Sequence, residues 1–491
     1  MISSGLQRTA ALVCAVVVAG VAQAASDTSA AVGVRAPGGD WLTFDYNPQR
    51  SGVDPLPTGI TAHTLRFLRR RTVTIDGTVD SAPVELHAVR VAGRTRDVVI
   101  VTTTYGRTLA LDPRTGARLW QFQPAGYRAL VGSAQITTAT PVIDPDRRFV
   151  YAASPDGRIH KLAIANGRQR WSTPITFDST HEKIAGALNV TSGFVVAATG
   201  GYYGDAPPYQ GHVVLIDRAS GRIAAVFNTL CSSRQRLIDP RSCPASDSAI
   251  WARSGSVVEP DGRILLATGN GPFNGSTDWG DSVLELSPEL QLLHNYTPTN
   301  QAQLEQTDTD LGSGSPALLS GRGGSRLALI AGKDGILRLL DLARLNGTPG
   351  PAGPRTGGEL QRLAAPGSAP VFTAPAVWRD RRGRTNVFVA SSGGTADYVL
   401  TRADRLAVSW QNSTPGASPI VAGGLLYVYD ATDGALLVYR PSSGARLARL
   451  PAAPGHWNSP IVVGGRIILP EGDANNHATS GTLDIYHLPG R

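Results

Sequence analysis

The sequence predicts an all-β chain folded as an eight-bladed β-propeller with four-stranded antiparallel blades. Three observations support this fold class: a strand unit that recurs along the chain, paired glycines at a fixed spacing inside it, and no sustained helical periodicity. A unit of this kind cannot bury its apolar face alone, so its copies pack side by side around a ring.

Each copy of the unit contains a short alternating strand that usually opens with glycine. In the four clearest copies a second glycine follows ten residues after the first, and successive copies start 51, 54, 70, 54, 59, 40 and 47 residues apart. Eight starts predict eight blades, with seven as the alternative because the copy at Gly394 is degenerate. The starts are Gly106, Gly157, Gly211, Asp281, Gly335, Gly394, Gly434 and Gly481.

The strands within a unit are joined by hairpin turns. In the first unit, strands are expected at 97–102, 108–111 and 118–122, and Pro113 and Gly116 supply the φ angles of the turn between the last two. The segment Thr72 to Ile75 is expected to close the ring as the outer strand of the C-terminal blade. Proline is tolerated at the start of a strand, and it opens six innermost strands, at Pro83, Pro141, Pro316, Pro375, Pro419 and Pro460.

The N-terminus has the pattern of a secretory signal peptide over residues 1–24. Arg8 precedes an apolar run from Ala11 to Ala22, and small residues follow at the expected cleavage site. We therefore expect a lead-in segment at 25–60, one propeller domain at 61–491, and a periplasmic or secreted protein without a transmembrane segment after signal removal. Val13 before Cys14 disfavours lipid anchoring.

The net charge of +8 comes mainly from arginines scattered over all repeats. Such charge favours anionic envelope surfaces. The basic residues are not interleaved with aromatic residues and do not line one face of a helix, as they do in nucleic-acid binders. Nucleic acid is therefore not an expected partner. We expect a monomer whose partner is a small-molecule alcohol, a protein or a glycan.

Two cysteines remain once the signal peptide is removed. Cys231 and Cys243 lie twelve positions apart in a polar loop. In an exported chain this spacing favours a local disulfide over a metal site, a redox pair or two free thiols.

The turns that end in tryptophan resemble those of a known family. Asp112 to Trp120, its echo at Ile164 to Trp171, and the opening segment Asp40 to Gly52 are similar to the repeats and lead-in of the pyrroloquinoline quinone (PQQ) quinoproteins of the alcohol dehydrogenase type. In that repeat the tryptophan docks between neighbouring blades. Outer-membrane assembly scaffolds of the BamB type share the repeat without a quinone, so the resemblance implies the fold more strongly than the function.

The resemblance implies a cofactor site for PQQ and calcium. PQQ is a planar tricarboxylate, so it needs an aromatic floor, which matches Trp251, and a cation, which matches Lys333. Calcium needs oxygen ligands, for which Asn270 and Asp205 are the candidates. The family's catalytic aspartate matches Asp308 and Asp310, one of which would remove the proton of the substrate hydroxyl.

The sequence also departs from the family. It has no adjacent cysteine pair and no Cys-x-x-Cys-His haem motif, and Asp205 is the only acid where the family has a calcium-binding glutamate. The segment Asp278 to Asp281 is interpreted as a loop-tip turn. Two functions follow: a divergent quinoprotein dehydrogenase that oxidises an alcohol or polyol, or a non-catalytic BamB-type scaffold for envelope proteins or glycans.

Overall fold

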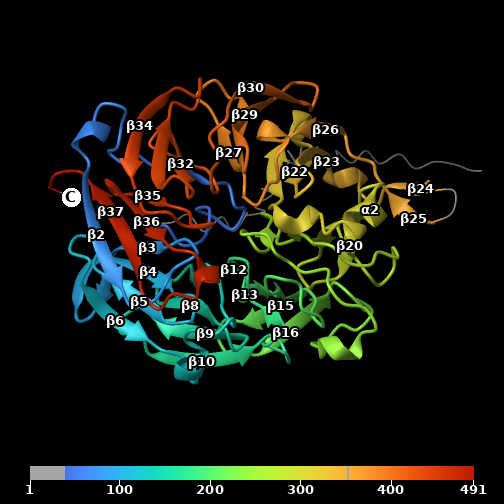
Figure 1. Cartoon of the computed structure of the whole chain (residues 1–491), viewed down its shortest axis with the longest axis horizontal. Helices are drawn as coiled ribbons and strands as arrows, with labels where there is room; N and C mark the ends of the chain where they lie inside the picture. Colours follow the sequence, from blue (N-terminus) through green and yellow to red (C-terminus); the bar gives the residue numbers. More distant parts are fainter. Residues whose placement is uncertain (1–38, 351–352, 491) are drawn as a thin grey trace, which may run out of the picture.

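Eight four-stranded antiparallel sheets stand in a ring, as the sequence predicts (Figure 1). The computed structural model describes residues 39–350 and 353–490; the expected signal peptide lies outside these residues. The first four blades are β3–β6 (Val84–Val91, Arg94–Thr102, Thr108–Leu111, Arg118–Phe122), β7–β10 (Val142–Ile143, Phe149–Ser154, Arg158–Ala163, Gln169–Pro174), β12, β13, β15 and β16 (Asn189–Thr191, Phe194–Ala198, His212–Asp217, Ile223–Asn228), and β17–β20 (Val257–Val258, Ile264–Ala267, Val283–Leu286, Leu292–Tyr296).

The remaining blades complete the ring. The blade that contains Gly394 is a regular four-stranded sheet, so the seven-bladed alternative is wrong. These blades are β21, β22, β23 and β26 (Ala317–Ser320, Arg326–Ala331, Ile336–Asp341, Gln361–Ala364), β27–β30 (Ala376–Arg379, Thr385–Ser391, Gly394–Leu400, Leu406–Asn412), β31–β34 (Ile420–Ala422, Leu425–Asp430, Ala435–Tyr439, Arg446–Pro451), and β35, β36, β37 and β2 (Ile461–Val463, Arg466–Glu471, Gly481–His487, Arg69–Ile75).

Few elements lie outside the blades. The short strand β1 (Val53–Asp54) pairs in parallel with β31, and two small sheets pair β11 (Glu182–Lys183) with β14 (Gly200–Gly201) and β24 (Thr348–Gly350) with β25 (Gly353–Thr356). In the described residues there are two short α-helices, α1 (Tyr127–Leu130) and α2 (Gln301–Gln306). None of the helices described is long and apolar enough to cross a membrane.

The two ends of the propeller meet in the last blade. Strand β2 pairs antiparallel with β37 along its whole length, from Arg69 opposite His487 to Ile75 opposite Gly481. Figure 1 shows the blue strand beside the red one. The predicted closure is confirmed, and the closing strand is three residues longer than the sequence suggested.

The second glycine of a unit is required because a side chain of the preceding blade lies against it: a tryptophan at Gly167, Gly221 and Gly444, and Val73 of β2 at Gly116. A Cβ on Gly167, whose φ is +70°, would lie 2.5 Å from the ring of Trp120. The indole Nε1 of Trp120 donates to Ile164 O at 2.7 Å. Trp171 lies in the same way against Gly221. The paired glycines therefore mark the contact between blades.

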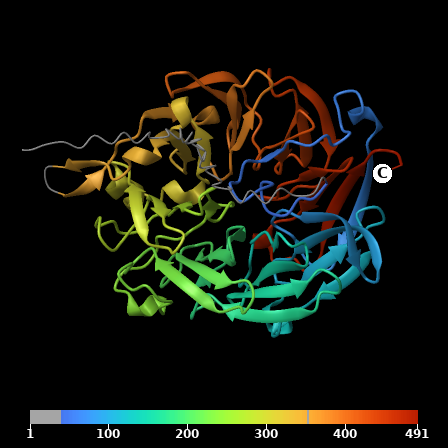
Figure 2. The ribbon, with the colours of Figure 1, turned by 180° about the vertical axis from the view of Figure 1, so that it is seen from behind.

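The lead-in crosses the inner strands rather than lying outside the ring (Figure 2). Its carbonyl groups accept hydrogen bonds from the inner strands of four blades, at distances of 2.8 to 3.0 Å. The donor–acceptor pairs are Ile143 N to Leu42 O, Val258 N to Pro48 O, Val377 N to Ser51 O and Val421 N to Gly52 O. The loops at the opposite end of the inner strands, among them 268–282, 297–316 and 332–335, are called the loop face below.

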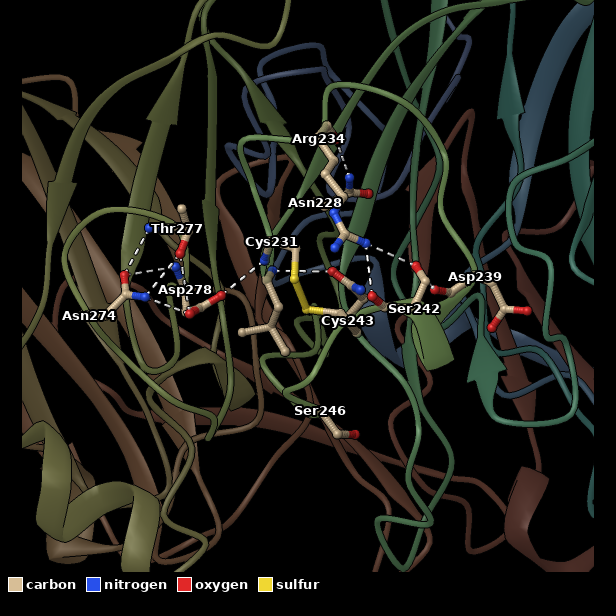
Figure 3. Close-up of a disulfide and its surroundings, with 12 residues drawn as sticks. Asn228, Cys231, Arg234, Asp239, Ser242, Cys243, Ser246, Asn274, Thr277 and Asp278 are labelled. Atoms are coloured by element: carbon tan, nitrogen blue, oxygen red, sulfur yellow. Dashed lines mark hydrogen bonds between the residues drawn. A yellow bond between two sulfur atoms is a disulfide. The ribbon is translucent and has the colours of Figure 1, made fainter.

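The longest interval between repeats, from Gly211 to Asp281, is folded around a disulfide. Cys231 and Cys243 are bonded, with Sγ–Sγ 2.05 Å and Cα–Cα 6.1 Å, as the sequence predicts (Figure 3). The backbone N–H of Cys231 donates to Asp278 Oδ1 at 2.9 Å. The disulfide thus anchors this loop to the neighbouring turn at 274–278.

We expect replacement of both cysteines by serine to lower the free energy of unfolding by about 3 kcal/mol, because the bond restricts a short loop in the unfolded chain. Urea unfolding of the double variant measures the change. The wild type unfolded in dithiothreitol is the control and should match the variant. An unchanged midpoint in both would show that the bond contributes nothing to stability.

Candidate functional site

Asn270, Asp310 and Lys333 meet on the loop face. Asp310 Oδ1 accepts from the backbone N–H of Asn270 at 2.8 Å, and Asp310 Oδ2 pairs with Lys333 Nζ at 2.5 Å. Each residue comes from a different segment: Asn270 follows β18, Asp310 precedes the turn at Leu311–Ser313, and Lys333 lies between β22 and β23. Asp310 therefore joins two blades.

Backbone contacts also hold Asp310 and Lys333 together. The N–H of Lys333 donates to Asp310 O at 2.9 Å. Gly332 makes the approach possible, because a Cβ there would lie 2.3 Å from Asp310 O. The hairpin Gly-Lys-Asp-Gly consequently presents Lys333 next to Asp310 whatever the charge state of either group.

Asp308 and Asp310 differ in their surroundings although both bind Lys333. The side chain of Asp310 is 4% exposed, whereas that of Asp308 is 55% exposed and lies 2.9 Å from Lys333 Nζ. Burial raises the pKa of Asp310 above its ordinary value, and the charge of Lys333 limits that rise. Burial alone would lower the pKa of Lys333. The charges and hydrogen bonds of Asp310 and Asp308 outweigh burial, so the pKa of Lys333 lies above its ordinary value.

Trp251 lies against the same cluster. A Cβ on Gly269 would lie 2.1 Å from Asp310 Oδ1 and 2.7 Å from Trp251 Cδ1, so glycine is needed between them. The ring of Tyr209 meets Trp251 edge-on, with centroids 6.1 Å apart. Neither Trp251 Nε1 nor Asn270 Oδ1, both buried, has a hydrogen-bond partner among the described residues.

Asp205 is not in direct contact with this group. Its Oδ1 accepts from the hydroxyl of Tyr209 at 2.9 Å, so it is linked to Trp251 through the Tyr209 ring. In the same segment, Tyr202 donates to Ser179 O at 2.9 Å. The structure therefore brings together five of the six predicted cofactor and catalytic residues and leaves Asp205 at the edge.

Two further acids belong to the cluster and were not singled out from the sequence. Asp281 lies in a turn, as predicted, but it is fully buried and not at the exposed tip of the loop. Its Oδ1 accepts from Leu311 N at 3.0 Å, and its Oδ2 has no hydrogen bond in the part of the chain described. Burial, with the charges of Asp310 and Glu305, raises its pKa to about 8. Glu305 accepts from Gly271 N.

The cluster has more acceptors than donors. Lys333 faces Asp308 and Asp310, while Asp281 and Glu305 add two carboxyl groups whose pKa values are raised mainly by burial. Buried oxygens without donors are suited to a hard cation such as calcium. Together with the indole of Trp251 and the ammonium of Lys333, the residues supply the kinds of group that a calcium-bound PQQ would need.

The comparisons with known proteins agree with the fold. The family model described as outer membrane protein assembly factor BamB matches residues 78–265. The quinohemoprotein alcohol dehydrogenase ADH IIB of Pseudomonas putida is 28% identical over 136 residues, which are 27% of this chain and 19% of that protein. The 1-butanol dehydrogenase (cytochrome c) of Thauera butanivorans is 26% identical over 169 residues, 34% of this chain and 23% of that protein. The matched segments thus span about a fifth of these curated relatives.

Solved structures match over much more of the chain. The quinohemoprotein alcohol dehydrogenase of Comamonas testosteroni has a TM-score of 0.66 and 16% identity, covering 92% of this chain and 81% of that one. A europium-containing methanol dehydrogenase has a TM-score of 0.68 and 15% identity, covering 92% and 98%. BamB from Moraxella catarrhalis has a TM-score of 0.51 and 11% identity, covering 86% and 99%. At these identities the similarity shows the fold.

The repeats and the fold are those of a β-propeller similar to the PQQ-type quinoproteins, which confirms the resemblance predicted from the sequence. The similar proteins include both alcohol dehydrogenases and an assembly factor. The choice between these two functions depends on the residues of the loop face.

Proposed function

We propose that this protein is a divergent PQQ- and calcium-dependent dehydrogenase that oxidises an alcohol or polyol. The observation that carries the proposal is the convergence of Trp251, Asn270, Asp310 and Lys333 around buried polar atoms that have no partner in the described chain. Unpartnered buried polar atoms are unfavourable unless a ligand, an ion or an ordered water satisfies them. We further propose that the protein acts in the periplasm or outside the cell, as a monomer.

Each residue would have a distinct role. Trp251 would support the quinone ring, Lys333 would bind a quinone oxygen, and Asn270 and Asp281 would supply oxygens to calcium. Bound PQQ would supply the acceptor for the hydride. Asp310 would take the proton from the substrate hydroxyl, since it is buried beside the floor and hydrogen-bonded at both oxygens. Asp308 holds Lys333 from the solvent side.

A BamB-type scaffold is the second candidate, because the BamB family model matches residues 78–265. Two aromatic side chains on the loop face favour it: Tyr203 is 89% exposed and Phe177 is 62% exposed. Exposed aromatic groups are common at protein interfaces. This function would use the rim of the loop face and would leave Trp251 and Asn270 without a ligand.

Reconstitution separates the two functions. We expect the apoprotein, mixed with PQQ and calcium, to retain about one quinone per chain after gel filtration and to reduce an artificial dye when an alcohol is added. Trp251→Ala should weaken PQQ binding by about tenfold or more, because the stacked surface is lost. Trp378→Ala, which removes a partly buried tryptophan of β27 far from the site, is the control and should bind normally. Absence of retained quinone in saturating calcium would favour the scaffold.

A further inference from the structure

A hollow lined by arginines lies between two neighbouring blades, at the end of the propeller opposite the loop face. Its volume is about 980 Å³. One of the two blades contains β21, β22, β23 and β26, and the other contains β27–β30 (Figure 1). Strand β22 runs from the hollow to the loop face, because the turn at 321–325 precedes this strand and the loop at 332–335 follows it. The hollow is therefore separate from the cluster around Asp310.

Three hairpin turns and an apolar lining enclose the hollow. Residues 320–324 connect β21 to β22, residues 382–385 lead into β28, and residues 400–404 connect β29 to β30. The apolar lining comes from Leu318, Val377 and Leu400, which are half-buried and pack against the cores of the blades. A ligand in the hollow would thus meet polar turns around an apolar surface.

The hollow carries a surplus of positive charge. A single acid, Asp404, lines it together with five exposed arginines: Arg322, Arg379, Arg382, Arg384 and Arg402. Among the described residues, the guanidinium groups of Arg322, Arg382 and Arg402 make no hydrogen bond or ion pair. These three groups come from the three different turns, so their donors surround the same space.

The nearby acids are engaged elsewhere. Asp404 accepts from the backbone N–H of Arg322 at 2.8 Å and from the hydroxyl of Ser325 at 3.2 Å, so it joins the two blades instead of pairing with a guanidinium group. Asp380 accepts from the backbone N–H groups of Arg382 and Arg384 at 2.9 Å, and it pairs with Arg384 Nε at 2.8 Å.

On the adjoining side of the hollow, Glu259 pairs with Arg326 at 2.7 Å. Of the five arginines that line the hollow, only Arg384 has a carboxylate partner in the described chain. The charge of the other four is left for an anion from outside.

The arrangement of the donors favours a phosphate group over a carboxylate. A phosphate monoester carries about two negative charges and three acceptor oxygens, so guanidinium groups from several sides can bind it at once. The planar guanidinium fork also matches phosphate oxygens. The apolar lining favours a phosphate attached to an organic group, and the volume lies within the range of about 300 to 1,000 Å³ that small-molecule sites occupy.

We propose that this hollow is a binding site for an organic phosphate that carries at least two negative charges. The phosphate can belong to a free ester, such as a sugar phosphate, or to the headgroup of a lipid. The site uses none of the residues assigned to the quinone, so it does not depend on the proposed dehydrogenase function.

Two probes test the site and separate the two sources. Glucose 1,6-bisphosphate, titrated by calorimetry, represents the free ester. Sedimentation with vesicles of phosphatidylcholine and phosphatidate represents the lipid headgroup, with vesicles of phosphatidylcholine alone as the blank. We expect at least one probe to bind the wild type and to bind the triple variant Arg322→Gln, Arg382→Gln, Arg402→Gln about tenfold or more weakly, because charge-assisted hydrogen bonds are lost. Loss with the bisphosphate assigns the site to a free ester, and loss with the vesicles alone assigns it to a lipid.

The matched control is a second triple variant, Arg114→Gln, Arg168→Gln, Arg222→Gln. These arginines are also exposed, and they lie at the same end of the propeller, in the turns between the third and fourth strands of the first three blades. The control removes the same charge away from the hollow, so it should keep the binding of the wild type. Both triple variants should unfold at the wild-type temperature, since exposed arginines without partners are replaced.

Three results would overturn the site. The first is a wild type that binds neither probe. The second is a loss in the first triple variant no greater than that in the control, because net charge would then account for any binding. The third is binding of an octaglutamate peptide that depends on Arg322, Arg382 and Arg402 while neither phosphate probe binds, which would indicate an acidic protein segment as the ligand.

Discussion

Asp310→Asn is expected to lower the turnover of the reconstituted protein by about 10² to 10⁴-fold while quinone is still retained. A positioned general base contributes a factor of this size. The asparagine can still accept from Asn270 N through its Oδ1, so the loop should keep its shape. Its amide cannot take a proton from the substrate hydroxyl. Dye-linked oxidation at saturating alcohol measures the change in kcat, and gel filtration measures the quinone retained.

Asp308→Asn is the matched control for this prediction. Asp308 binds the same Lys333 but is 55% exposed, so its charge is screened by solvent. We expect a change in turnover of only a few fold. If both variants lost activity equally, the role of the two acids would be to orient Lys333. If Asp310→Asn retained full turnover, Asp310 would not be the base.

Arg50→Met is expected to lower the free energy of unfolding by about 3 to 5 kcal/mol, the usual loss when one partner of a buried charged network is removed. Arg50 is 1% exposed and joins the lead-in to the inner segments of two blades. Its guanidinium donates to Ser254 O at 3.1 Å, Leu188 O at 3.0 Å, Phe44 O at 2.9 Å and Thr43 Oγ1 at 2.5 Å. Removal leaves several buried acceptors without a donor.

Urea unfolding of Arg50→Met measures this loss, with Arg118→Met as the control. Arg118 pairs with Asp76 at 2.8 Å, but both side chains are more than half exposed. Its removal should change stability by less than about 1 kcal/mol. A similar small effect for Arg50 would mean that the lead-in is not an integral part of the propeller.

The fold was predictable because the residues that define a blade repeat. The prolines Pro83 and Pro419 each stand immediately before an inner strand, and Gly167 and Gly221 each lie under a tryptophan of the preceding blade. These features recur at fixed positions in each repeat, so the sequence alone shows them. The path of the lead-in was harder to predict from the sequence, because the contacts of Arg50 with Leu188 and Ser254 join segments more than 130 residues apart.

The candidate site was predictable only where the chain resembles a known pattern. Trp251, Asn270, Asp310 and Lys333 were found by their local motifs, and the structure places them together. Asp281 was misinterpreted because an aspartate next to glycine is common in exposed turns.

A crystal structure grown with PQQ and calcium tests the proposed quinone site most directly. We predict a planar quinone on the indole of Trp251, an oxygen-ligated cation beside Asn270 and Asp281, and Lys333 in contact with a quinone oxygen. Quinone bound away from Trp251, or a loop face that holds no quinone under conditions of saturating ligand, would contradict the proposal.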